Sequence, residues 1–348
     1  MHWWKLVAAL FLSISIGIGL NTPLAPGIEN YSPTVATEGD TIQLLIAVVN
    51  AGLKTHSQNL SCYLISDSTN VKAVELNPKD NENLTTNFIV PRGIIGSSSK
   101  HRLFDLLVNS DYDGNIILKN AVDISSDSLI EGNKYSSRPI QINHEVPSYF
   151  SFPMREILYE SIRNLFYHVP MWFAMTILLC VAMFFSFKFL RSNNLHDDLK
   201  AAAFTQVALM FGFAGIITGM QWAKVTWGAW WNNDPKESAA AIGLLIYSAY
   251  FVLRSAIDDP EKRARISSVF NVFALGIFIP IIYIVPRLTE SLHPGNGGNP
   301  GFNSYDLDGN LRLIFYPSII GWTLLGVWMA QLHFRIARIN PHLLSDNN

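Results

Sequence analysis

The chain has 348 residues, of which 49% are hydrophobic and only 15% are charged, and its formal net charge is -2 at pH 7. So small a charged fraction is typical of a membrane protein, and the net charge of -2 excludes a basic nucleic-acid-binding protein. The two cysteines, Cys62 and Cys180, form no Cys-x-x-Cys pair, so thiol redox chemistry is not expected. Phosphate-loop, dinucleotide and zinc-protease patterns are also missing, and we expect no enzyme of these classes.

An apolar run at residues 6–20 follows Lys5 near the N-terminus. It resembles a signal segment, but no convincing small-residue cleavage site comes after it. We therefore predict an uncleaved anchor helix within residues 1–26.

Residues 27–150 are more polar and contain short β-rich runs. The runs lie at residues 41–49, 60–65, 84–90, 103–108 and 115–124, with a turn signal at 111–114. Short strands separated by turn residues predict a small antiparallel β-sandwich domain inserted after the anchor. No metal-ligand or nucleophile spacing occurs in it, so its expected role is partner binding.

The remaining residues, 151–348, are predicted to form a five-helix membrane core. Apolar residues recur at helical spacing over 154–166, which predicts an amphipathic helix at the membrane interface. Longer apolar spans follow at 170–189, 201–220, 238–253, 266–285 and 313–332. With the anchor, these spans give an α-helical integral membrane protein with six transmembrane helices, each close to the ~20 residues that a bilayer requires.

Basic residues are distributed unequally between the two sets of helix ends. One set carries Lys5, Lys188, Arg191, Lys200, Arg254, Lys262, Arg263, Arg265, Arg335 and Arg338, and the other carries Lys224, Lys236, Arg287 and Arg312. The positive-inside rule assigns the first set to the cytoplasm. Both termini are then cytoplasmic, and residues 27–150 are extracytoplasmic.

Four of the nine tryptophans lie in the stretch at residues 222–237, which this topology also places outside. They are Trp222, Trp227, Trp230 and Trp231. An interfacial aromatic belt explains them as well as a flat aromatic ligand does on spacing alone. At the end of the stretch, Asp234, Pro235 and Glu237 predict the N-cap, first residue and capping-box partner of the next helix, so neither acid is assigned a catalytic role.

Two histidines, His168 and His293, lie on the same predicted side as the tryptophans. A haem requires axial nitrogen ligands, an apolar aromatic surface, and cations or N–H donors for its propionates. The histidines could ligate iron from opposite sides, while Lys224, Lys236 or Arg287 could meet the propionates. For each histidine alone, an interfacial side chain with a wet polar tip is the alternative. Two histidines that flank four tryptophans favour haem.

The sequence resembles the haem-handling proteins that carry a tryptophan-rich "WWD" motif, a superfamily that includes CcmC, CcsA and CcmF. The likeness is greatest to the CcmC family, the haem exporter proteins C of System I cytochrome c maturation. It rests on Trp227-Gly-Ala-Trp-Trp231 with Asp234, on His168-Val-Pro170, on Ser291-Leu-His293, and on the order of the six helices.

This resemblance implies a haem-binding and haem-delivery protein for c-type cytochrome biogenesis, not an enzyme with its own catalysis. It implies non-covalent haem b in transit, with His168 and His293 as the metal ligands. The implied cofactor-binding residues are Trp222, Trp227, Gly228, Trp230, Trp231, Asp234 and Lys236. The implied partners are a CcmE-like haem chaperone, an ABC-type CcmA/CcmB-like complex and membrane lipid.

Two features keep other interpretations open. Asn233 stands where the family usually has a further tryptophan, and the run from Asp234 to Glu237 is closer to CcsA. A CcsA-like System II haem transporter and cytochrome c synthase subunit is therefore the alternative within the same chemistry. A non-haem membrane adaptor that binds a partner through its sandwich is the alternative from another class.

Overall fold

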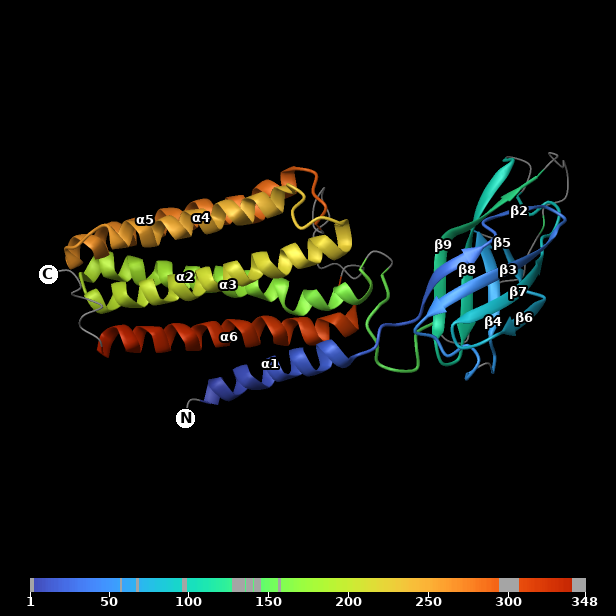
Figure 1. Cartoon of the computed structure of the whole chain (residues 1–348), viewed down its shortest axis with the longest axis horizontal. Helices are drawn as coiled ribbons and strands as arrows, with labels where there is room; N and C mark the ends of the chain where they lie inside the picture. Colours follow the sequence, from blue (N-terminus) through green and yellow to red (C-terminus); the bar gives the residue numbers. More distant parts are fainter. Residues whose placement is uncertain are drawn as a thin grey trace. The chain divides into compact units, whose positions relative to one another are not determined.

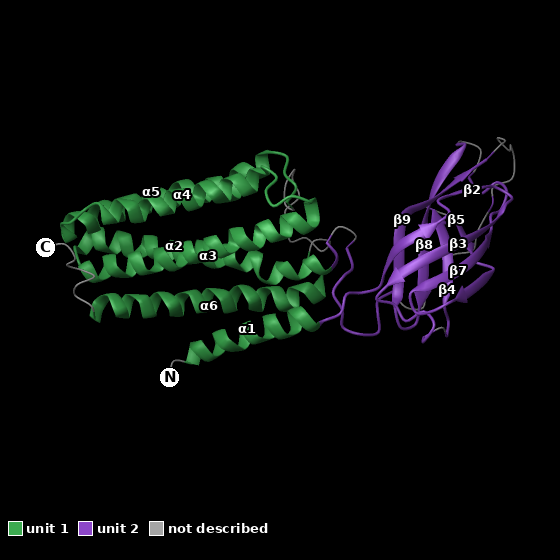
Figure 2. Cartoon of the chain, viewed as in Figure 1, with its two compact units in different colours: residues 1–21, 160–348 green, residues 22–159 purple. Residues whose placement is uncertain are grey.

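The structure is a computed structural model, and it describes residues 3–56, 58–66, 69–95, 99–126, 135, 140, 145–155, 158–293 and 307–339. The chain divides into two compact units, shown in Figure 2. A β unit spans Thr22–Tyr159, and a helical unit combines Met1–Asn21 with Glu160–Asn348.

The β unit contains two sheets among its described residues (Figure 1). The first has the order β1 (Gly27–Ser32), β3 (Thr41–Val49), β7 (Asn83–Ile89) and β6 (Glu75–Pro78). The second has the order β2 (Val35–Thr37), β9 (Gly114–Ser125), β8 (His101–Ser110), β4 (Ser61–Ser66) and β5 (Thr69–Lys72).

Alternating burial along the strands places one hydrophobic core between the sheets. In β3, Ile42, Leu44 and Ile46 are buried while the residues between them are exposed or half-buried. They belong to one cluster with Leu64 and Phe104 of the second sheet, as expected when the inner faces of two sheets pack together. The predicted β-sandwich is confirmed.

The sequence missed the strands at the sheet edges. β1, β2, β5 and β6, none of them predicted, are the four edge strands. Edge strands are short and lack a neighbour on one side, so they carry little of the hydrophobic alternation that identifies a central strand. The antiparallel prediction also fails at one pair, because β2 runs parallel to β9.

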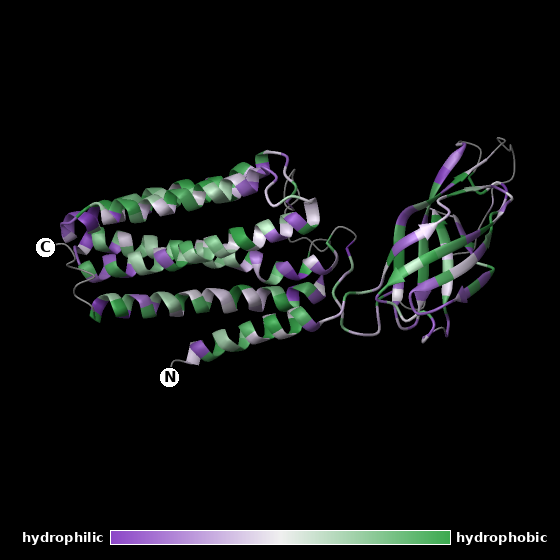
Figure 3. Ribbon diagram, viewed as in Figure 1, coloured by the Kyte–Doolittle hydropathy of each residue, from purple (hydrophilic) through white to green (hydrophobic). Residues whose placement is uncertain are grey.

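The helical unit contains six helices that are long and apolar enough to cross a membrane, counted over the described part of the chain. They are α1 (Trp3–Asn21), α2 (His168–Ser192), α3 (Leu195–Trp227), α4 (Pro235–Ser255), α5 (Pro260–Ile279) and α6 (Gly309–Ile339). Hydrophobic residues cover the middle of these helices, and hydrophilic residues gather at their ends (Figure 3). The chain is thus a multi-pass membrane protein with six candidate spans, as predicted.

The amphipathic helix predicted at 154–166 is shorter than expected. Its described part is a 3-10 helix, η1 (Tyr159–Phe166), whereas residues 156 and 157 lie outside the described residues. Ile162 and Phe166 of η1 are buried, and Arg163 donates to the Gly19 carbonyl at the end of α1. The segment therefore joins α1 to the later helices within the helical unit.

An ion pair is buried at the end of the bundle opposite the tryptophan stretch. Arg254 of α4 donates to both carboxylate oxygens of Asp198 of α3, at 2.7 and 2.9 Å, and its Nη1 lies 3.4 Å from the Tyr250 hydroxyl. The neighbouring Asp197 is buried too and accepts from Lys188 of α2 at 3.1 Å. A buried carboxylate requires such partners, so these contacts fix how α2, α3 and α4 meet.

Removing one partner of the Asp198–Arg254 pair should destabilise the helical unit. Arg254→Met leaves the buried Asp198 carboxylate without its guanidinium, which costs about 3–5 kcal/mol in the free energy of unfolding. Asp198→Leu combined with Arg254→Met removes both charges and should recover most of that loss. Denaturant unfolding in detergent measures the difference.

Glu160→Gln is the control, because the Glu160 side chain is 66% exposed and its loss should cost under about 0.5 kcal/mol. If the double variant were as unstable as Arg254→Met, the pair would not be the cause.

Candidate functional site

The chain leaves α3 and enters α4 through a tight loop that carries the tryptophan motif. Gly228 follows α3 with φ 83°, a left-handed conformation that glycine adopts without steric cost. Pro235 then opens α4, and Asp234 with Glu237 forms the predicted capping box. The Glu237 carboxylate accepts from the backbone N–H groups of Asn232 and Asp234, at 2.8 and 3.4 Å. These bonds fix the loop close to the start of α4.

His168 is the first residue of α2, and its ring is buried against α3. Its Nδ1 lies 2.9 Å from the Gly215 carbonyl oxygen and 3.2 Å from the Thr218 hydroxyl. A carbonyl oxygen can only accept, so Nδ1 carries the proton and the lone pair of the neutral ring is on Nε2. Gly219 makes room for this ring, since a Cβ at that position would lie 2.7 Å from Cε1 of His168.

His293 lies at the same site, although it comes from the segment that follows α5. The chain leaves α5 through a π-helical turn, η2 (Pro280–Ile284), and a 3-10 turn, η3 (Val285–Leu288). Prolines at 280 and 286 lack the N–H that would continue an α-helix, which explains why the apolar span ends in these turns. His293 follows, and its Nδ1 donates to the Asp234 carboxylate at 2.8 Å.

The carboxylate of Asp234 and the imidazole of His293 have shifted pKa values. Burial acts to raise the pKa of Asp234, but hydrogen bonds from Ser291 and Leu292 and the charge of His293 together lower it below its usual value. Burial lowers the pKa of His293, and this outweighs the opposing effect of Asp234. Because the Asp234 carboxylate accepts from Nδ1 of His293, the lone pair of the neutral ring is on Nε2.

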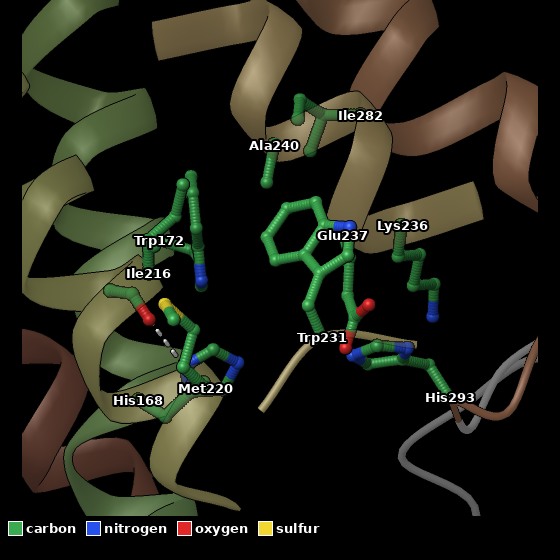
Figure 4. Close-up of a pocket in the computed structure, with 12 residues that line it drawn as sticks. His168, Trp172, Ile216, Met220, Trp231, Lys236, Glu237, Ala240, Ile282 and His293 are labelled. Carbon is green, nitrogen blue, oxygen red and sulfur yellow. Dashed lines mark hydrogen bonds between the residues drawn. The ribbon is translucent and has the colours of Figure 1, made fainter. Parts of the chain in front are cut away.

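A cavity of about 130 Å³ lies between the two histidines. His168 and His293 stand on opposite sides of it in Figure 4. Its walls are His168, Trp172, Gly215, Ile216, Gly219, Met220, Trp231, Lys236, Glu237, Ala240, Ile282 and His293. Pockets for drug-sized ligands are usually about 300–1,000 Å³, so a large flat molecule has to protrude from this cavity or displace its walls.

Aromatic rings connect the two histidines. The Trp222 ring lies 5.9 Å from that of His168 and 6.1 Å from that of Trp227, and the Trp227 ring lies 4.9 Å from that of His293. The Trp222 indole nitrogen is buried without a hydrogen-bond partner among the described residues. Trp231 lines the cavity directly. Trp222 and Trp227 thus lie behind the histidines, outside the residues that line the cavity.

The other predicted site residues have different positions. Trp230 is 55% exposed and does not line the cavity, and Gly228 shapes the loop. Lys236 lines the cavity, whereas Lys224 donates to the Gly228 carbonyl at 2.8 Å.

Sequence reasoning missed most of the residues that line the cavity, and three of these also explain how His168 is packed. Trp172 lies one helical turn after His168 and lines the cavity with it. Gly215 and Gly219 of α3 provide space for Trp172 and His168, respectively. The Gly-x-x-x-Gly spacing in an apolar helix is the signal that could have found them, because it marks a close helix contact.

Known proteins resemble the region that contains this site. Residues 146–343 match the family described as CcmC, heme exporter protein C. Heme exporter protein C of Escherichia coli strain K12 is 25% identical over 138 residues, which cover 40% of this chain and 54% of that protein. The Bradyrhizobium diazoefficiens protein of the same name is 30% identical over 131 residues, covering 37% and 49%.

A second type of relative appears beside these. Cytochrome c biogenesis protein CcsA of Prochlorococcus marinus is 38% identical over 87 residues, 25% of this chain and 27% of that protein. The chain thus spans about half the length of the heme exporter relatives and a smaller share of the CcsA relative. Residues 1–145, with the strands of the β unit, lie outside the family match.

A side chain at position 219 should displace the ring of His168. In Gly219→Ala the new methyl group would lie 2.7 Å from Cε1 of His168, so the ring has to shift, at about 1–3 kcal/mol of stability. Gly276→Ala is the matched control, because nothing lies within 4 Å of a Cβ there. Unfolding midpoints of the two variants in detergent measure the effect. Equal midpoints would contradict a tight contact between Gly219 and the His168 ring.

Proposed function

This chain belongs to the heme exporter protein C family, and we propose that it binds haem non-covalently between His168 and His293 and presents it for cytochrome c assembly. The observation that carries the proposal is the pair of imidazoles beside one cavity, each with its Nδ1 hydrogen-bonded to an acceptor. In this role the chain hands haem to another protein and makes no covalent bond itself.

The tautomers support His168 and His293 as axial ligands. Iron binds the nitrogen that carries a lone pair, and in both rings the acceptor at Nδ1 leaves that lone pair on Nε2. A second residue that holds the remote ring nitrogen is the usual arrangement for a metal-binding histidine. The group that accepts from Nδ1 differs between the two rings. It is the Gly215 carbonyl for His168 and the Asp234 carboxylate for His293.

The surrounding side chains suit a porphyrin with two propionates. Trp231 and Trp172 line the cavity, and Trp222 and Trp227 pack on the two histidines. In the proposal these indoles contact the macrocycle, and Lys236, at the edge of the cavity, pairs with a propionate. Trp230, Gly228 and Asp234 serve the site through the shape of the loop.

The orientation and the partners are further parts of the proposal. The excess of basic residues at the end of the bundle that holds Arg254 assigns this end to the cytoplasm of a bacterial inner membrane, and the haem site then faces outward. From there haem passes to a CcmE-like chaperone, beside an ABC-type CcmA/CcmB-like complex. The β unit adds an extracytoplasmic surface for a partner.

Two alternatives remain testable. The partial match to CcsA and the Asp234-Pro-Lys-Glu237 run favour a System II haem transporter and synthase subunit as the second candidate. A membrane adaptor without haem is the candidate from a different class. The absorbance spectrum of the purified protein separates that adaptor from the haem proteins, since only a haem protein has a Soret band.

Substituting either axial histidine should change the haem spectrum in a way that imidazole reverses. His168→Gly or His293→Gly leaves iron without one ligand and opens space for an outside base, so added imidazole should restore a low-spin spectrum and part of the haem content. His196→Gly, at the opposite end of the bundle, is the control and should keep the wild-type spectrum. An unchanged six-coordinate spectrum in both site variants without imidazole would show that other residues hold the iron.

Substituting a tryptophan should instead weaken haem binding without chemical rescue. Trp231→Ala removes stacking area worth about 1–3 kcal/mol, and imidazole cannot replace a surface. Trp230→Ala is the matched control from the adjacent position, since Trp230 is largely exposed and should lose less. Haem titration of the purified variants measures both affinities. Equal losses of affinity would contradict the placement of Trp231, and not Trp230, at the cavity.

A further inference from the structure

Asp234 forms more hydrogen bonds than a helix cap requires. Its Oδ1 accepts from the Lys236 backbone N–H at 2.9 Å, which is the capping bond. The same carboxylate also accepts from the Ser291 hydroxyl at 3.0 Å, the Leu292 N–H at 2.7 Å and His293 Nδ1 at 2.8 Å. Its side chain is only 1% exposed, so these donors replace water around the charge. Capping alone would be served equally well by asparagine or serine.

The two histidines are held by different kinds of backbone structure. His168 belongs to a helix, and its ring is held by a backbone carbonyl and by the tight contact with Gly219. His293 lies after the end of η3, on a segment that is neither helix nor strand. Three consecutive residues of this segment bind the Asp234 carboxylate. The Asp234 side chain therefore holds the segment that carries the His293 ring, and the ring also contacts Trp227.

The same carboxylate connects His293 to the tryptophan loop. Glu237 accepts from the backbone of Asn232 and Asp234, and the Trp231 indole donates to Asn233 at 3.1 Å. The loop that carries Trp231 and the segment that carries His293 thus meet at Asp234. A displacement of the first turn of α4 would move the aromatic surface and the imidazole together.

We infer that Asp234 is a positioning residue that holds His293 in the Nδ1–H tautomer and makes its Nε2 the more electron-rich of the two proposed ligands. The inference rests on the proposed function for its haem part. An anionic acceptor at Nδ1 draws the proton towards itself and increases the electron density of the ring more than a peptide carbonyl does. The two sides of a bound haem would therefore be chemically unequal, with the stronger donor on the side of the WWD motif.

The test uses Asp234→Asn, which keeps an N-cap but removes the negative charge. The matched control is Asp259→Asn, because Asp259 caps α5 in the same way, accepts from the Lys262 N–H at 2.6 Å and lies at the opposite end of the bundle. We expect Asp234→Asn to lower haem affinity about 10- to 100-fold and to shift the haem midpoint potential upward. Asp259→Asn should leave both quantities unchanged.

A second measurement needs no haem. Nitrogen-15 NMR of labelled histidine in the haem-free protein distinguishes the two tautomers, and the missing signal in His293→Gln identifies the residue. We expect an Nδ1–H imidazole at His293 in the wild type and a loss of that preference in Asp234→Asn. This measurement decides the contact even if Asp234→Asn folds poorly, because the wild-type signal alone reveals the tautomer.

The outcomes separate the two proposals. Wild-type protein that shows Nε2–H at His293, or Asp234→Asn protein with wild-type affinity and potential, overturns the inference about Asp234. A wild-type protein that binds no haem overturns the proposed function, and the tautomer measurement still decides the role of Asp234.

Discussion

The free N–H groups at the start of α4 impose a constraint on which the arrangement of the site depends. A helix that begins at the end of a membrane span exposes backbone donors that need acceptors, and Asp234 and Glu237 supply them. Because Asp234 is buried, its charge in turn requires further donors, and the segment at 291–293 provides these. A local requirement of one helix end thus brings His293 to the loop that carries Trp231.

The parts of the fold that were predictable from the sequence are those that local chemistry specifies. The capping box was visible in Asp234-Pro-Lys-Glu237, and the six helices were visible in the length of the apolar spans. The bond between Asp234 and His293 was not visible, because it joins residues far apart in the chain. The packing of the His168 ring against Gly219 could not be predicted for a similar reason. A glycine in an apolar helix indicates close packing but does not identify the residue that packs there.

The two ends of the bundle solve the problem of buried charge differently. At one end Asp198 and Arg254 neutralise each other through a two-pronged ion pair, which leaves both charges fully engaged. At the other end the Asp234 carboxylate is met by the Ser291 hydroxyl, a backbone N–H and an imidazole, and the ammonium group of Lys236 lies on the wall of the same cavity.

Under the proposed function, the different backbone positions of the two histidines also affect how haem leaves the site. Moving His168 requires α2 to shift against α3, where Gly215 and Gly219 already allow contacts as close as side-chain packing permits. Moving His293 requires that the segment at 291–293 leave Asp234 and that the ring leave Trp227, but no membrane-spanning helix has to shift. Bonds to a charged group are each worth about 1.5–3 kcal/mol net, so the buried Asp234 carboxylate needs replacement donors when this segment leaves. The side of the cavity formed by His293 is therefore the side that can open without a helix shift, and under the proposed function a protein that receives haem would approach it there.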